Sequence, residues 1–142
     1  MARPKVLNVV GNPEDLQRQH ITDAGYDLRV KTEVEVVPGK VVVAPTGVKV
    51  AIPEKCVGVI AVRSSIGKRG ICLANGVGII DSGYRGEMKL LLTSLTGPQT
   101  LFAGERVAQL LILPLQPVAV KFVEELEDSD RGERGIGSTG VK

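Results

Sequence analysis

The sequence predicts an all-β domain, a sandwich or a barrel, and three observations support that prediction. Short apolar or alternating runs recur along the chain, each closed by Gly, Pro, Asn or Asp. Aromatic residues make up only 3% while glycine contributes 17 residues, a balance typical of an aliphatic β-core with tight turns. Helix signals are confined to two short segments. A chain of 142 residues holds one ordinary core, so we expect one folded domain.

Eight runs have the length and pattern of strands. They are residues 5–10, 26–37, 40–44, 48–52, 57–62, 71–74, 88–94 and 107–113. β-branched stretches at 33–36 and 41–43 flank the turn signal Pro38 and Gly39, which predicts a hairpin. The regular spacing of turns favours a sandwich or a barrel.

Two segments carry helix signals. Across 13–20, Asn12 is a candidate cap and Pro13 occupies the first helical position, where its fixed φ suits a helix. A short helical turn is expected across 64–70. Helix is therefore a minor element.

Charge and composition exclude several classes of protein. The net charge is +2 and the basic residues form no stripe, so we expect no nucleic-acid partner. No apolar run reaches membrane length and the first residues lack a signal-peptide core, so no membrane association is expected. Cys56 and Cys72 are too few for a disulfide framework and follow no metal spacing, which indicates buried thiols in a cytoplasmic protein.

The composition changes near the C-terminus. Residues 124–130 are acidic and poor in apolar residues, and 131–140 are rich in glycine. This predicts a mobile arm, 128–142, after a β-domain that covers 1–127. A frayed terminus is the alternative. However, alternating glycines expose backbone N–H groups, and Arg131, Arg134, Ser138 and Thr139 add donors suited to phosphate oxygens.

A basic, hydroxyl-bearing turn follows the strand at 57–62. Arg63, Ser64 and Ser65 offer donors to phosphate groups, with a solvated surface turn as the alternative. The segment lacks the Gly-Lys-Ser/Thr ending of a P-loop, so that mode of binding is excluded.

Two further segments carry chemistry at strand ends. Asp81 closes the apolar run 77–80, and Tyr84 follows three residues later. A carboxylate there can be partly desolvated and hold a water as general base, although an Asp that begins a turn is the plainer interpretation. Arg106 and Gln109 open the strand that ends at 113 and, three positions apart, are expected on opposite faces.

Five segments, taken in order, closely resemble the five motifs of the trimeric dUTPases. They are 24–28 (Ala-Gly-Tyr-Asp-Leu), 63–65 (Arg-Ser-Ser), 78–87 (Gly-Ile-Ile-Asp-Ser-Gly-Tyr-Arg-Gly-Glu), 104–110 (Gly-Glu-Arg-Val-Ala-Gln-Leu) and 131–140 (Arg-Gly-Glu-Arg-Gly-Ile-Gly-Ser-Thr-Gly). Five motifs at compatible separations make a chance match negligible. The resemblance implies a jelly-roll-like β-barrel subunit and a homotrimer with sites between subunits, each closed by a flexible arm.

The implied reaction is hydrolysis of dUTP to dUMP and diphosphate, which limits uracil incorporation into DNA and supplies dUMP for dTTP synthesis. By this resemblance Asp81 holds the water that attacks the α-phosphorus, and Gln109 helps to orient it. Mg²⁺ would be held through substrate phosphates and water, so no protein metal ligand is expected.

The resemblance also implies the substrate contacts. Backbone groups of Ile79 and Ile80 and the Asn75 amide would pair with uracil, and Tyr84 would pack beneath the deoxyribose and exclude a 2′-hydroxyl. The implied contacts to phosphate and to the rest of the substrate are Arg63, Ser64, Ser65, Lys89, Arg131, Ile136, Gly137, Ser138 and Thr139. Asp27 and Arg106 are expected to brace the site structurally.

Two positions depart from the family pattern. Ser65 stands where many members have Gly. Ile136 stands where the arm usually has an aromatic residue that stacks over uracil, a contact worth roughly 1 kcal/mol or more. We therefore expect a looser lid.

Two rival functions stay open at this point. A dCTP deaminase shares this fold and a similar hairpin, but its general-base glutamate falls on the next strand, where 88–92 reads Met-Lys-Leu-Leu-Leu. A non-catalytic trimer that binds a nucleotide or a protein is the other; the retained Asp81, Arg131, Ser138 and Thr139 weigh against it. Release of dUMP from dUTP, of ammonia from dCTP, or of neither product distinguishes the three.

Overall fold

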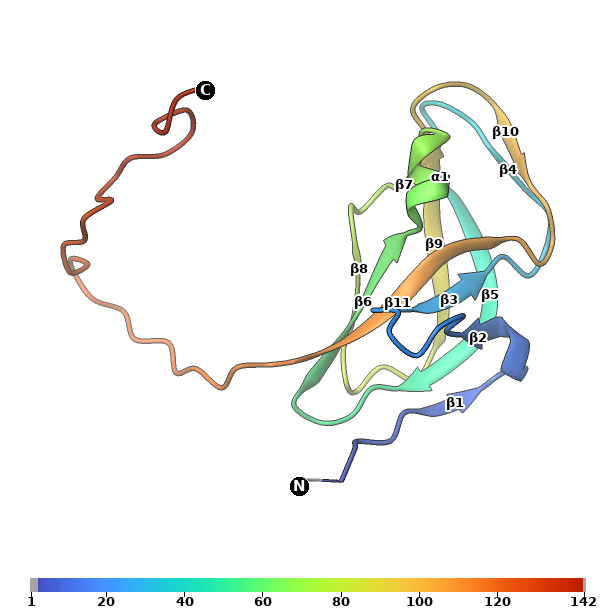
Figure 1. Ribbon diagram of the computed structural model, residues 1–142, viewed down its shortest axis with the longest axis horizontal. Coiled ribbons are helices and arrows are strands. Elements are labelled where there is room, and N and C mark those ends of the chain that lie inside the picture. The colour runs from blue at the N-terminus through green and yellow to red at the C-terminus, as the bar shows by residue number, and fades with distance from the viewer. Residues whose placement is uncertain (1–2, 142) are drawn as a thin grey trace.

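The computed structural model describes residues 3–141, which form a β-barrel and a long C-terminal tail (Figure 1). A four-stranded sheet has the order β1 (Asn8–Val10), β5 (Val42–Ala51), β9 (Glu87–Ser94), β7 (Ile71–Leu73). A five-stranded sheet has the order β2 (Leu16–Gln17), β3 (Tyr26–Arg29), β11 (Arg106–Pro114), β6 (Cys56–Val62), β8 (Gly78–Ile80). The short β10 (Gln99–Leu101) and β4 (Val34–Val36) form a separate pair. The predicted all-β fold is confirmed.

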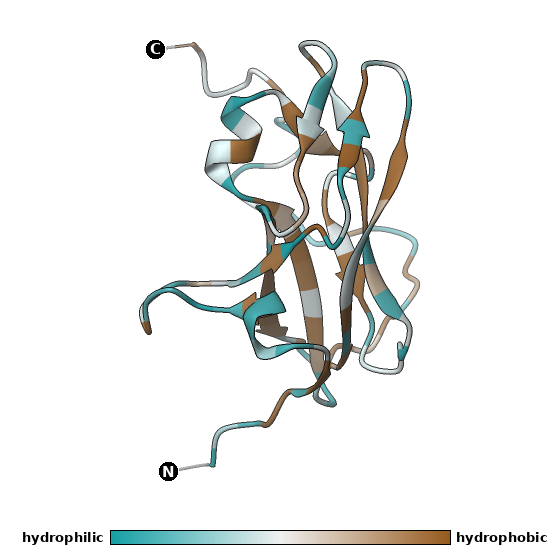
Figure 2. Cartoon of the chain, turned by 90° about the vertical axis from the view of Figure 1, so that its right-hand side faces the viewer, coloured by the Kyte–Doolittle hydropathy of each residue, from teal (hydrophilic) through white to brown (hydrophobic). Residues whose placement is uncertain are grey.

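The core lies between the two larger sheets and is built from aliphatic side chains. In β9 the alternation is strict: Met88, Leu90 and Leu92 are at most 1% exposed, while Lys89 between them faces solvent. Hydrophobic and hydrophilic residues alternate along the strands in the same way in Figure 2. Side chains in a strand point to opposite faces in turn, so one face of each sheet is buried.

The predicted hairpin between 33–36 and 41–43 is wrong. β4 pairs antiparallel with β10, joining Val34 to Leu101 and Val36 to Gln99. β5 pairs instead with β1 and β9. A turn signal such as Pro38-Gly39 predicts where the chain bends but not which strand becomes the neighbour, and β10 contains only one strongly apolar residue to reveal it.

The two strands predicted at 40–44 and 48–52 are one strand, β5. Its register with β9 shifts between Pro45 and Lys49, and Gly47 has a φ of 73°. A bulge accommodates a proline, which cannot donate to the ladder, and a glycine in the left-handed region.

The first helix prediction is too long. Only η1 (Pro13–Asp15), a 3-10 turn, forms, and Asn12 makes no side-chain cap. Leu16 enters the sheet opposite Leu28, so pairing overrides the helix signal. The second prediction is confirmed by α1 (Ser64–Lys68). No helix within residues 3–141 is long and apolar enough to cross a membrane.

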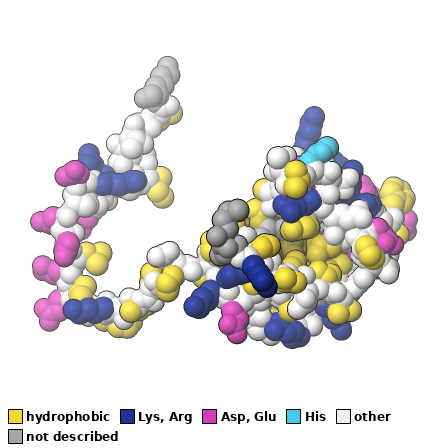
Figure 3. Space-filling view, turned by 60° about the horizontal axis from the view of Figure 1, so that its bottom comes forward, with side chains coloured by type: hydrophobic (Ala, Val, Ile, Leu, Met, Phe, Trp, Pro, Cys, Tyr) yellow, Lys and Arg dark blue, Asp and Glu magenta, His cyan; other side chains and the backbone are white. Residues whose placement is uncertain are grey.

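The tail begins where β11 ends at Pro114, before the expected arm. Its apolar side chains stand out in solvent: Val118 is 79%, Val120 80% and Phe122 95% exposed. Figure 3 shows the tail clear of the barrel, with apolar side chains along it. An exposed apolar run of this kind needs a covering surface.

Candidate active site

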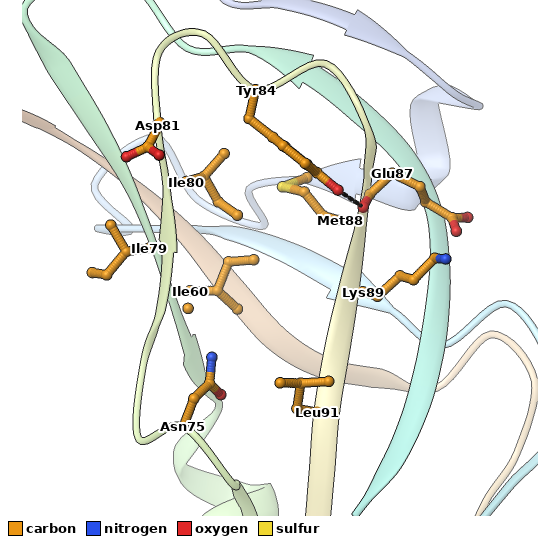
Figure 4. Close-up of a pocket in the computed structure, with 11 residues that line it drawn as sticks. Ile60, Asn75, Ile79, Ile80, Asp81, Tyr84, Glu87, Met88, Lys89 and Leu91 are labelled. Atoms are coloured by element: carbon orange, nitrogen blue, oxygen red, sulfur yellow. Dashed lines mark hydrogen bonds between the residues drawn. The ribbon is translucent and has the colours of Figure 1, made fainter.

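A pocket of about 250 Å³ lies between the β8 hairpin and β9. Six residues expected from the sequence line it: Asn75, Ile79, Ile80, Asp81, Tyr84 and Lys89. Figure 4 shows Asn75 at one end of the pocket and Tyr84 at the other. One short hairpin thus supplies most of the side chains that the sequence assigns to nucleoside binding.

The hairpin is anchored by β8. This strand pairs with β6, opposite Gly58 to Ile60, and lies at the edge of its sheet. One side of an edge strand's backbone has no ladder partner and can bind another molecule. Ile80 packs against the core, whereas Ile79 is 58% exposed and points away from β9 (Figure 4).

Asp81 begins the turn that follows β8, and its carbonyl accepts a hydrogen bond from the Tyr84 N–H at 3.1 Å. The Asp81 side chain is exposed in the single chain. The partial desolvation expected for it is therefore not supplied by its own chain.

Tyr84 closes one end of the pocket. The residue is 44% exposed, and its hydroxyl donates to the Glu87 carbonyl at 2.9 Å, the dashed line in Figure 4. The Glu87 carboxylate in turn accepts from the Gly47 N–H at 2.9 Å. Glu87 also lines the pocket, a role that the sequence reasoning missed; its place at the end of the 78–87 motif was the available signal.

A second, more polar pocket of about 420 Å³ shares no lining residue with the first. Asp27, Arg63, Ser64, Arg106 and Gln109 contribute to it. Asp27 lies 3.3 Å from the guanidinium groups of both Arg63 and Arg106, and its side chain is only 14% exposed. One carboxylate thus orients two arginines, which would otherwise repel each other.

The prediction that Arg106 and Gln109 face opposite sides is wrong, because both line this second pocket. The register of β11 against β3 shifts between Arg106 and Ala108, and the consecutive residues Val107 and Ala108 are both buried. The additional residue of a bulge changes the alternation by one position. Residues three apart therefore reach the same side.

The remaining expected residues do not join either pocket. Ser65 is exposed on α1. The arm residues Arg131, Ile136, Gly137, Ser138 and Thr139 belong to the tail. The end of the tail, drawn in red in Figure 1, lies away from the barrel. The hydrogen bonds recorded for the arm are local, such as Arg131 Nε to the Arg134 carbonyl at 3.0 Å. One chain therefore forms the hairpin pocket and the polar pocket of the expected site. The arm, the third part, lies apart from both.

The chemistry of the donors bears on metal binding. Within residues 3–141, no group of three or more His, Cys, Asp or Glu side chains is arranged to hold a metal ion. In the first pocket the acidic side chains are Asp81 and Glu87, and Glu87 already accepts a backbone hydrogen bond.

Comparison with known proteins identifies the family. A family model described as dUTPase matches residues 12–140. The deoxyuridine 5′-triphosphate nucleotidohydrolase of Cutibacterium acnes is 41% identical over 140 residues, covering 96% of this chain and 92% of that protein. Its counterpart from Mycolicibacterium gilvum is 44% identical over 131 residues, covering 87% and 85%. The solved Staphylococcus bacteriophage 80alpha dUTPase with dUPNHPP has a TM-score of 0.84 at 31% identity, covering 97% of this chain and 100% of that one. The chain therefore belongs to the dUTPase family.

Proposed function

We propose that this protein hydrolyses dUTP to dUMP and diphosphate, with Asp81 activating the water that attacks the α-phosphorus. The observation that carries the proposal is the single pocket lined by Asn75, Asp81 and Tyr84 on the β8 hairpin. Family membership along almost the whole chain supports the substrate, as does the phage dUTPase solved with dUPNHPP.

Base selection follows from the edge strand. Backbone groups of Ile79 and Ile80, with the Asn75 amide, are suited to the Watson–Crick edge of uracil. Cytosine presents the opposite donor and acceptor pattern, so each mismatched buried group would cost about 1 to 3 kcal/mol. The hairpin would therefore accept dUTP and reject dCTP, and Tyr84 would exclude the 2′-hydroxyl of UTP by contact with the sugar.

The reaction is an in-line displacement by water. Asp81 takes a proton from the water while the water oxygen bonds to the α-phosphorus. The bond between the α-phosphorus and the oxygen that bridges to the β-phosphorus breaks, and diphosphate leaves. In the shared site, Gln109 orients the water from the second pocket of a neighbouring chain, and Arg63, Ser64 and Ser65 of that pocket's surroundings bind the phosphates. Lys89 contributes near the substrate. Asp27 keeps Arg63 and Arg106 in place through its two ion pairs.

A Mg²⁺ ion would be held through the substrate phosphates and water, since residues 3–141 present no cluster of three or more acidic, His or Cys side chains for it. When bound, the ion would neutralise phosphate charge and polarise the scissile bond.

A homotrimer with shared sites explains how the separate parts come together. The two pockets have no residue in common, and the tail carries side chains such as Val120 and Phe122 that are at least 80% exposed. A closed ring of three identical chains covers such surfaces with a single repeated interface. We propose that the arm, 128–142, closes over a neighbour's site, with Arg131, Gly137, Ser138 and Thr139 on the phosphates and Ile136 over the base.

The cellular role follows from the reaction. Removing dUTP limits uracil incorporation into DNA, and the dUMP formed supplies dTTP synthesis. Cys56 and Cys72 are free thiols, which supports a location in the reducing cytoplasm.

The test is a product assay on the full chain with Mg²⁺. We expect dUMP and diphosphate from dUTP, and neither product with dCTP as substrate. Ammonia from dCTP would assign a deaminase instead, and tight binding of dUTP without turnover would assign a non-catalytic trimer.

A further inference from the structure

We propose that Gly86 and Glu87 are positioning residues that hold the Tyr84 ring in place and thereby set the selectivity for deoxyribose. The inference rests on the proposed function, in which Tyr84 contacts the sugar. It adds two residues that do not themselves need to touch the substrate. Gly86 leaves space for the Tyr84 ring, and the Glu87 carbonyl accepts the Tyr84 hydroxyl.

Gly86 lies directly against the ring. A Cβ at this position would come within 2.6 Å of Tyr84 Cζ and 3.1 Å of Cε2, and closer still to the hydroxyl oxygen. Contacts below 3.0 Å essentially never occur for real Cβ atoms, so any other residue would displace the ring. Gly86 is not among the glycines with positive φ, so its backbone conformation is open to alanine. The requirement for glycine therefore comes from the tyrosine ring.

Glu87 holds the same, hydroxyl end of the ring. Its carbonyl accepts the Tyr84 hydroxyl at 2.9 Å, and its carboxylate accepts the Gly47 N–H at 2.9 Å. Glu87 also pairs with Lys49 across the β5 bulge. The residue whose carbonyl accepts the Tyr84 hydroxyl is thus bonded to β5 through Gly47. The position of the ring therefore depends on the space that Gly86 leaves for it and on the hydrogen bond made by its hydroxyl.

The same turn contains a matched control. Apart from its two chain neighbours, a Cβ at Gly83 would meet nothing within 4 Å, and Gly83 likewise lacks a positive φ. Gly83→Ala makes the same chemical change in the same turn, at a position with open space beyond its chain neighbours. A difference between the two alanine variants therefore reports the contact with Tyr84 rather than a general loss of turn flexibility.

The kinetic test compares kcat/KM for dUTP and UTP. We expect Gly86→Ala to lower the dUTP-to-UTP ratio of kcat/KM by about tenfold or more, since the added methyl group displaces the ring from beneath the sugar and leaves space for a 2′-hydroxyl. Gly83→Ala should leave the ratio unchanged. In a Tyr84→Ala background, Gly86→Ala should have no further effect on the ratio. A wild-type ratio in Gly86→Ala, or additive effects in the double variant, overturns the proposal.

A second pair of variants tests Glu87 and covers a failure of Gly86→Ala to fold. Glu87→Ala removes the acceptor for Gly47 and should lower the ratio by roughly threefold, whereas Glu87→Gln keeps a side-chain oxygen there and should restore it. Equal ratios for all three residues at position 87 would contradict the role of Glu87.

A spectroscopic test is independent of turnover. The chain has no Trp and two Tyr, so Tyr26→Phe leaves Tyr84 as the sole tyrosine. In that background, the ring ¹H–¹³C NMR signals of Tyr84 should move in Gly86→Ala and stay in place in Gly83→Ala. Unmoved signals in Gly86→Ala overturn the inference whether or not the wild type hydrolyses dUTP. Moved signals without any dUTP hydrolysis would instead sink the proposed function alone.

Discussion

The β8 hairpin and the C-terminal tail carry comparable numbers of expected substrate contacts, yet they are organised in opposite ways. The hairpin is fixed by its pairing with β6 and by the bonds from Tyr84 and Gly47 to Glu87. The tail makes short-range bonds, such as those between Arg131 and Arg134, and its apolar side chains face solvent. Under the proposed function, nucleoside recognition would therefore be built into one chain, whereas closure over the phosphates would need the arm of another chain.

This contrast predicts that the largest loss comes from the preformed hairpin. Asp81→Asn should lower the single-turnover rate of dUTP hydrolysis by about 10² to 10⁴, the usual contribution of a general base. Binding of dUTP, measured by calorimetry, should persist because the amide has the same shape. Turnover near the wild-type rate would remove Asp81 from the role of base.

Truncation of the tail should have the next largest effect. A chain ending at residue 130 loses Arg131, Ser138 and Thr139, and charge-assisted bonds to phosphate contribute about 1.5 to 3 kcal/mol each. Three such bonds at the lower limit sum to about 4.5 kcal/mol, so we expect kcat/KM for dUTP to fall by about 10³, while native mass spectrometry still detects a trimer. Full activity of the truncated chain would make the arm dispensable.

A smaller effect is expected from the ring that closes the hairpin pocket. Tyr84→Ala should narrow the kcat/KM gap between dUTP and UTP by about tenfold, because space opens beneath the sugar. The matched comparison is Tyr26→Phe, which alters the tyrosine of β3 outside this pocket. An unchanged gap in Tyr84→Ala would assign sugar selectivity to another group.

The smallest effect concerns the tip of the arm. Ile136→Phe should lower KM for dUTP by about fivefold, corresponding to roughly 1 kcal/mol of added stacking on uracil. Ile136→Leu keeps an aliphatic side chain and should leave KM unchanged. A KM that is equal or higher in the Phe variant would mean that stacking does not limit closure of this arm.

The sequence predicted the residues of the hairpin pocket better than it predicted which strands pair. Asn75, Asp81 and Tyr84 were expected together, and a local hairpin brings them together because few residues separate them. Pairing of β4 with β10 was missed, since it joins segments more than 60 residues apart and turn signals carry no information on distant partners. The bulge at Val107, which changes the face that Gln109 occupies, was also missed. Residues 107–113 are nearly all apolar, so the alternation that would reveal an additional residue is absent from the sequence.

Subunit exchange tests the central claim, that a complete site takes Asp81 and the arm from different chains. Two proteins of strongly reduced activity are mixed: Asp81→Asn with an intact arm, and the chain truncated after residue 130 with an intact Asp81. Around any mixed ring of three, one neighbouring pair has the required order, so each mixed trimer should regain one competent site and dUTP hydrolysis should return. If native mass spectrometry confirms mixed trimers and no hydrolysis is recovered, the arm acts on its own chain and the shared-site arrangement is wrong.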